Sequence, residues 1–242
     1  MRTVLFGAMY AALAGPAVAQ GIDVGALMPQ GAPAAGRIVQ IVAVLTVLSV
    51  APSLLVMATC FTRLVVALSF LRSGLGLQTT PANLVVVSLA LFMTMFVMAP
   101  TFDKAWNDGV KPAIENQIGE REAFERIVEP FRTFMARNVR EKDLNLLDGL
   151  AHDSIRAKNG DKIDMRILVP AFMMSELRRG FEIGFLIALP FLVIDMIVAT
   201  LTMAMGMMML PPSIISLPIK VLFFVLIDGW SLLVGSLIRS YG

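Results

Sequence analysis

Three charged side chains stand inside long apolar runs of the sequence: Asp195, Lys220 and Asp228. A charge at the centre of a membrane is costly unless it is paired or wetted, so such residues usually have a function. Opposite charges can staple helices together, a series of charges can relay protons, and two adjacent acids can activate water. The sequence therefore offers three kinds of chemistry: an ion pair, an ion pathway and acid catalysis.

The spacing of these charges from the Pro211-Pro212 turn predicts their heights in a helical hairpin. Asp195 lies sixteen residues before Pro211 and Lys220 nine residues after it, about 24 Å and about 13 Å along a helix. Asp228, seventeen residues after the turn, is expected beside Asp195. The two opposite charges can then meet if a neighbouring copy is displaced along the axis by about 10 Å or if the helices kink strongly, and we expect them to pair between neighbouring, staggered copies. The alternative is that Lys220 snorkels and the acids are protonated.

The two acids alone do not indicate an enzyme. No GxGD motif accompanies Asp195 or Asp228, and no Ser/His or HExxH arrangement occurs elsewhere. The single cysteine, Cys60, and the single histidine, His152, predict no disulfide, metal site or Cys/His pair. We expect no enzymatic activity, no cofactor and no metal, and any ATP chemistry must belong to a partner because no nucleotide-binding loop is present.

Three consecutive methionines, Met207, Met208 and Met209, join two long apolar runs. Pro211 and Pro212 follow and forbid a continuous helix. Methionine side chains are flexible and polarizable, so they can close an opening and still repack around varied partners. The pattern predicts a soft plug at the tip of a helical hairpin, with ordinary core packing as the alternative.

Composition places the chain outside the soluble globular class. Of its 242 residues, 57% are hydrophobic and 16% are charged, and the mean hydropathy is +0.78, more apolar material than one soluble core can bury. The formal net charge of +2 argues against a nucleic-acid partner. An all-α, membrane-associated protein is expected.

The N-terminal residues have the pattern of a cleavable signal peptide. Arg2 precedes a short apolar core at 4–13, and small residues at 17–19 form a cleavage site. The core is too short to cross about 30 Å of hydrocarbon, which argues against an uncleaved first span. We expect residues 1–19 to be removed and residues 20–36 to form a flexible linker.

Four apolar segments predict two helical hairpins, residues 37–100 and 169–242, and the first hairpin turns on its basic, cytoplasmic side. The segments are 38–62, 84–100, 185 to the methionines, and 214–238. Between the hairpins, residues 101–168 carry interspersed acids and bases and predict a polar, helical, periplasmic domain. Apolar residues at helical spacing predict two amphipathic helices there, one opening at Pro130 and one near Asp164.

Five long strings carry a resemblance to a known family. They are PSLLVMATCFTRLVVALSFLR (52–72), ALFMTMFVMAP (90–100), PFRTFMARNVREKDL (130–144), LVPAFMMSELRRGFEIGF (168–185) and LPFLVIDMIVATLTMAMGMMMLPPSIISLPIKVLFFVLIDGWSLLVGSLIRS (189–240). In this order they resemble the FliP family of flagellar biosynthesis proteins. The departures are small: Cys60 replaces a serine or another small residue, and Asn138-Val139 replaces a common polar pair.

The resemblance implies a core, pore-forming subunit of the flagellar type III protein export gate. Members of the family form a pentameric ring, joined by FliQ and FliR subunits and other export-apparatus proteins, through which unfolded flagellar proteins leave the cytoplasm. The resemblance also implies that the hairpins pack against neighbouring subunits. The complex would then lie largely on the periplasmic side of the bacterial inner membrane, in the flagellar basal body.

The resemblance also implies roles for single residues. The three methionines would form a gasket across the channel, with Gly206 permitting close approach and Pro211 and Pro212 fixing the turn.

Polar contacts between subunits are the second implied role. Glu176 and Arg140 lie within the matching strings, and we expect them to join Asp195, Lys220 and Asp228 in such contacts. An ion or proton transporter that uses the three intramembrane charges as a relay is the alternative, and it predicts ion flux by the isolated protein.

Overall fold

The computed structural model describes residues 56–77, 82–151, 163–207 and 211–241, together with residues 42, 45, 46, 49 and 53. The chain divides into two units, Met1–Pro52 and Ser53–Gly242, and all elements discussed below belong to the second. The expected signal peptide, the linker and most of the first apolar segment lie outside the described residues.

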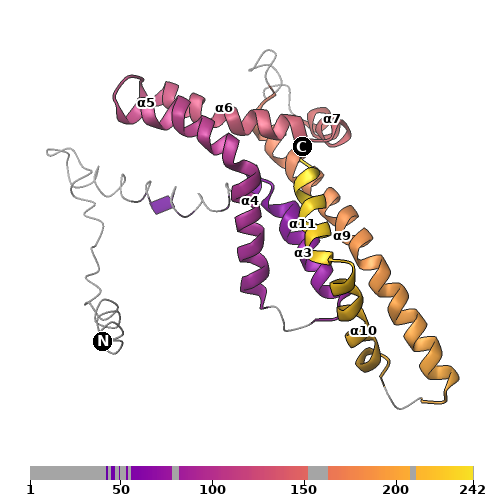
Figure 1. Cartoon of the computed structure of the whole chain (residues 1–242). Helices are drawn as coiled ribbons and strands as arrows, with labels where there is room; N and C mark the ends of the chain where they lie inside the picture. Colours follow the sequence, from indigo (N-terminus) through magenta and orange to yellow (C-terminus); the bar gives the residue numbers. More distant parts are fainter. Residues whose placement is uncertain are drawn as a thin grey trace, which may run out of the picture. The chain divides into compact units, whose positions relative to one another are not determined.

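Every regular element in the second unit's described residues is a helix, as the sequence predicts (Figure 1). In chain order they are α3 (Phe61–Gly74), α4 (Asn83–Ala105), the π-helix η2 (Trp106–Val110), α5 (Lys111–Ile114), α6 (Glu120–Asn138), α7 (Glu141–Leu150), α9 (Met165–Ala204), α10 (Ser213–Leu226) and α11 (Gly229–Arg239).

Helix α9 is the element on which α3, α6, α7 and α10 pack (Figure 1). It runs for 40 residues, so the helix expected near Asp164 and the third apolar segment are one continuous helix. The Asp164 carboxylate caps its first turn by accepting a hydrogen bond from the Arg166 backbone N–H at 2.8 Å. The Arg166 side chain also donates to this carboxylate, and these hydrogen bonds lower the pKa of Asp164.

Small residues on α9 let α3 approach closely. A β-carbon added at Gly184 would lie 2.7 Å from Phe70 Cβ, and one added at Gly180 would lie 3.1 Å from Val66 Cβ. Both helices are apolar at this contact, so backbone proximity and side-chain packing hold them together. This pair forms the frame that receives the remaining helices.

The polar region differs from the sequence prediction at the start of α6. The prediction that a helix opens at Pro130 is wrong, because α6 begins at Glu120 and Pro130 lies inside it. Ala123, Ile127 and Phe131 already recur at helical spacing before and across Pro130, so the helical period was present and the proline was wrongly taken as its start. Upstream, the π-helix brings Gly109 against α6, where an added β-carbon would lie 2.5 Å from Ile127 Cγ1.

Among the residues that the structure describes, two helical stretches, Asn83–Ile114 and Met165–Ala204, are long and apolar enough to cross a membrane. Helices α10 and α11 form a third candidate only as a pair, because they are bent by 64°. The fourth apolar segment is therefore broken at Asp228, which adopts a left-handed φ of 51°. Aspartate tolerates this conformation better than most residues, and at Gly229, which follows, an added β-carbon would lie 2.2 Å from Phe224 Cε2.

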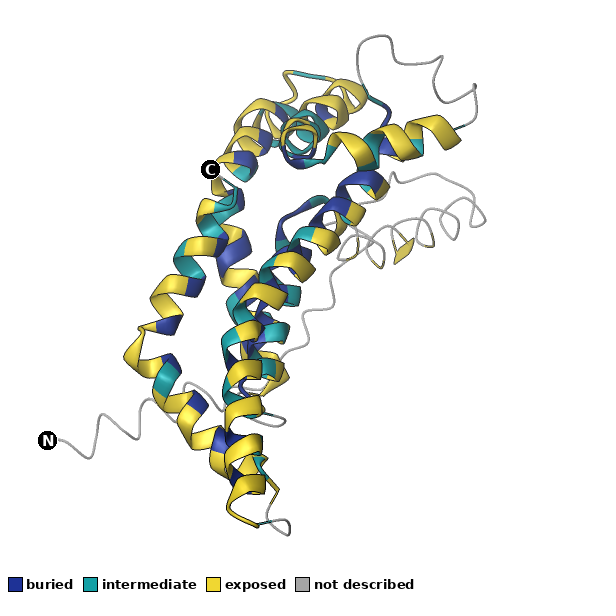
Figure 2. Ribbon diagram, turned by 90° about the vertical axis from the view of Figure 1, so that its right-hand side faces the viewer, coloured by how far each residue is buried: buried dark blue, intermediate teal, exposed yellow. Residues whose placement is uncertain are grey.

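The core of this unit lies where α3, α4, α9, α10 and α11 meet, around Leu64, Ala90 and Leu237. A second cluster of Met135, Leu168 and Phe172 joins α6 to α9. Outside these clusters, large apolar side chains on α4, α9 and α10 stay exposed (Figure 2). Surfaces of this kind require a membrane or another protein to cover them.

Candidate functional site

The tip of the C-terminal hairpin is built by the end of α9. Gly206 has a φ of +74°, its N–H donates to Met203 O at 3.0 Å, and the Met207 N–H donates to Thr202 O at 3.1 Å. This is a glycine-terminated helix end, in which the left-handed residue returns the chain on itself. An added β-carbon at Gly206 would meet nothing within 4 Å, so within one chain the glycine is needed for its backbone conformation.

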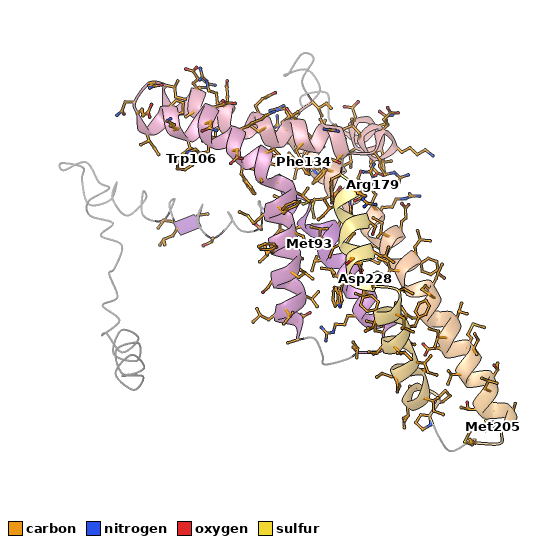
Figure 3. All side chains as sticks on the ribbon, in the orientation of Figure 1. Met93, Trp106, Phe134, Arg179, Met205 and Asp228 are labelled. Atoms are coloured by element: carbon orange, nitrogen blue, oxygen red, sulfur yellow. The ribbon has the colours of Figure 1, made fainter. Side chains whose placement is uncertain are left out.

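Methionines extend along this tip beyond the predicted triplet. Met203 and Met205 are 62% and 70% exposed, and Figure 3 places Met205 at the end of α9 far from Phe134 of α6. Met207 is half-buried, whereas Met208 and Met209 lie outside the described residues. The sequence analysis did not predict Met203 and Met205 at the tip, because it considered only the three consecutive methionines and not the alternating ones before them.

The two prolines begin α10. Pro212 is its N-cap residue, and the backbone carbonyls of Pro211 and Pro212 accept hydrogen bonds from the Ile214 and Ile215 N–H groups, each at 3.1 Å. A proline at this position loses little, because the first N–H groups of a helix have no partner within the helix. The prolines therefore start a new helix directly after the turn.

Asp195 and Lys220 form an ion pair within one chain, with Lys220 Nζ 2.5 Å from Asp195 Oδ2. The prediction that they lie at different heights in one hairpin is wrong. Counting from Pro211 treated the whole connection as helix, but α9 ends at Ala204 and α10 begins at Ser213. From these ends the two residues lie about 14 Å and about 10 Å along their helices, nearly level.

Lys220 also reaches the end of α3. Its ammonium donates to the Gly74 carbonyl at 3.0 Å, and its side chain is only 5% exposed while that of Asp195 is 41% exposed. The carbonyls at a helix C-terminus carry partial negative charge and favour a cation. Lys220 thus ties α10 to both α9 and α3.

Asp228, expected beside Asp195, instead lies at the bend between α10 and α11, where its side chain is exposed (Figure 3). The expected pair of adjacent acids is therefore replaced by the Asp195–Lys220 pair. In the described ranges no three His, Cys, Asp or Glu side chains are grouped to hold a metal.

Glu176 forms a buried ion pair with Arg63 of α3. Arg63 Nε donates to Glu176 Oε2 at 3.0 Å, Arg63 Nη2 contacts Glu176 Oε1, and both side chains are 0% exposed. Tyr241 donates its hydroxyl to the same carboxylate. Sequence reasoning missed both partners of Glu176, because Arg63 and Tyr241 lie 113 and 65 residues from it along the chain.

Arg140 lies between α6 and α7, close to α9. Its backbone N–H donates to Ser175 Oγ at 3.0 Å, and Ser175 in turn donates to Asp143 Oδ2 at 2.7 Å. Arg140 Nη1 is 4.0 Å from Glu182 Oε1 and has no hydrogen-bond acceptor among the described residues. The partners seen for Arg140 and Glu176 thus belong to their own chain.

Comparison with known proteins identifies the family of this chain. Residues 44–237 match the model of the FliP family. The chain belongs to the FliP family. Three similar FliP-family proteins carry the name flagellar biosynthetic protein FliP. The one from Agrobacterium fabrum is 63% identical over 208 residues, 86% of this chain and 85% of the relative. The one from Rhizobium meliloti is 57% identical over 243 residues, which cover 100% of this chain and 99% of the relative. The one from Bacillus subtilis is 48% identical over 203 residues, which cover 84% of this chain and 91% of the relative.

The FliP-family match includes α3 to α10, most of α11, and the turn between α9 and α10. The chain is therefore a flagellar biosynthesis protein of the export apparatus, with helices long and apolar enough for a membrane.

Proposed function

We propose that this chain is the core pore-forming subunit of the flagellar type III protein export gate. In this role a pentameric ring passes unfolded flagellar proteins, and methionines from each copy close the channel as a gasket. The observation that carries the proposal is the tip of α9, where Gly206 ends the helix among exposed and half-buried methionines.

Methionine suits such a closure for physical reasons. Its unbranched thioether chain repacks around varied surfaces, and a ring of apolar side chains resists wetting by water and ions. Met203 and Met205 enlarge the proposed gasket beyond Met207, Met208 and Met209, because both side chains are largely exposed in the single chain.

The exposed apolar faces support assembly with other subunits. Phe92 of α4, Met196 of α9 and Leu226 of α10 are 74%, 69% and 75% exposed. We propose that further copies, FliQ and FliR subunits and membrane lipid cover these faces, with the complex on the periplasmic side of the bacterial inner membrane. Other export-apparatus proteins would join it in the flagellar basal body.

Of the five polar residues expected to contact other subunits, only some are proposed for that role here. Asp195, Lys220 and Glu176 have partners inside the chain, so the ring does not need them as staples between copies. Asp228 is exposed, and the Arg140 side chain stays 24% exposed. We propose these two as the polar contacts between subunits.

The test replaces Met207, Met208 and Met209 together by alanine and measures ion leakage and flagellar protein export in cells. The matched control replaces Met57, Met95 and Met174, three exposed methionines away from the tip. Increased leakage by the first variant alone, with assembly intact, supports the gasket; unchanged leakage and normal export contradict it. Ion flux by the isolated protein in vesicles would favour a transporter instead.

A further inference from the structure

Two residues after α11, Ser240 and Tyr241, close over the buried Arg63–Glu176 pair. Arg63 Nη1 donates to Ser240 O at 3.1 Å and to Ser240 Oγ at 2.9 Å. The Arg63 guanidinium carbon lies 3.7 Å from the centroid of the Tyr241 ring. The Tyr241 hydroxyl donates to Glu176 and lies 3.4 Å from the Cys60 carbonyl oxygen.

These contacts complete the hydrogen bonding of a buried charge pair. Glu176 occupies Nε and Nη2 of Arg63, and Ser240 supplies the acceptors for Nη1. Both charged side chains are 0% exposed, so water cannot replace a lost partner without opening the structure. Burial, and then the Glu176 carboxylate, raise the pKa of Tyr241, which keeps its hydroxyl protonated as a donor.

Tyr241 extends the connection to α6. Its ring stacks on Phe134 with centroids 6.0 Å apart and an interplanar angle of 24°. Phe134 in turn meets Phe172 of α9 edge-on at 5.9 Å. One aromatic side chain thus contacts α3, α6 and α9 directly after α11 ends.

We propose that Ser240 and Tyr241 are positioning residues that form a latch, fastening the end of α11 to the α3–α9 pair. Lys220 fastens α10 to the same two helices, and the bend at Asp228 lies between these attachments. The C-terminal helices are therefore held at two separate points. The consequence of the latch for the export gate, a fixed orientation of α10 and α11 against α9, rests on the proposed function.

Cys60 provides a native reporter for the latch. It is the only cysteine in the sequence, its side chain is 0% exposed, and its carbonyl contacts Tyr241. Because its thiol is buried, labelling in the closed state is slow. Lifting the latch would expose this thiol to a water-soluble maleimide.

The experiment measures the labelling rate of Cys60 in the full chain, purified as the assembled complex. Tyr241→Leu removes both the stacking and the hydroxyl, and we expect about tenfold faster labelling. Tyr241→Phe retains the stacking, so about threefold is expected, and Ser240→Ala behaves similarly. The control is Arg239→Ala, whose exposed side chain precedes the latch.

An effect limited to the latch variants, measured well below the thermal midpoint of each complex, supports a positioning role. Unchanged labelling in Tyr241→Leu, or an equal increase in Arg239→Ala, overturns the proposal. If Tyr241→Leu does not accumulate, Tyr241→Phe and Ser240→Ala decide, and unchanged labelling in both overturns it. The labelling is independent of what the complex transports, so leakage in the methionine variants tests the proposed function separately.

Discussion

Lys220 of α10 and Asp195 of α9 are paired inside a single chain, 2.5 Å apart, with the lysine buried and the acid partly exposed. Because Lys220 also donates to the Gly74 carbonyl, the ammonium sits between an acid and the end of a helix. The pair therefore holds α10 against α9 and α3. The unequal exposure of its two side chains predicts which single mutant loses more stability.

Asp195→Ala is expected to destabilise the protein by about 1–3 kcal/mol, because it leaves the buried ammonium with only the Gly74 carbonyl. Lys220→Met is expected to cost less, because the remaining Asp195 is partly exposed and can be hydrated. Denaturant unfolding of the purified protein measures both. A larger loss in Lys220→Met than in Asp195→Ala would argue against this ordering.

Exchanging the two charges should not restore stability. In the Asp195→Lys, Lys220→Asp variant the new carboxylate would face the Gly74 carbonyl, which needs a donor. Stability of the exchanged variant should therefore stay near that of the worse single mutant. Complete recovery would mean that attraction between the pair alone matters.

Gly184→Ala should separate α3 from α9, because its β-carbon would lie 2.7 Å from Phe70. We expect a loss of about 1–3 kcal/mol, typical of overpacking. Gly235→Ala on α11 is the matched control: its β-carbon would meet nothing within 4 Å, and a helix gains about 0.5–1 kcal/mol from this change. Equal effects of the two variants in thermal unfolding would refute the close approach at Gly184.

Glu176→Ala should cost about 3–5 kcal/mol, because it leaves Arg63 charged and buried without its carboxylate. The double variant Arg63→Met, Glu176→Leu removes both charges and should be less destabilised than Glu176→Ala alone. Unfolding of the purified complex compares them. A double variant as unstable as the sum of the single variants would contradict the interpretation that the cost comes from an unpaired charge.

The Asp164 carboxylate gives a pH-dependent contribution to stability. Hydrogen bonds from Arg166 hold its pKa below the ordinary value of 3.8. A lowered folded-state pKa stabilises the protein above pH 3.8, and this contribution is lost as pH falls through the lowered value. Asp164→Asn should therefore unfold more easily than the parent at pH 7, and the difference should shrink under acid. A constant difference across this range would exclude the charge as its source.

Long apolar runs were sufficient to predict an all-helical protein, because burial and hydropathy dominate such segments. The level pairing of Asp195 with Lys220 was not predictable from residue counts, since it depends on where α9 ends and α10 begins. The Arg63–Glu176 pair joins residues 113 positions apart, and no local pattern encodes such a contact. The prediction that a helix opens at Pro130 failed because proline is tolerated inside α6.

The most direct test of the methionine gasket is the conductance of the purified, assembled complex in a planar lipid bilayer. The gasket predicts a closed resting complex and sustained ion conductance when Met207, Met208 and Met209 are all alanine. Equal, silent recordings from both complexes, with assembly verified, would contradict the claim that these methionines close the channel.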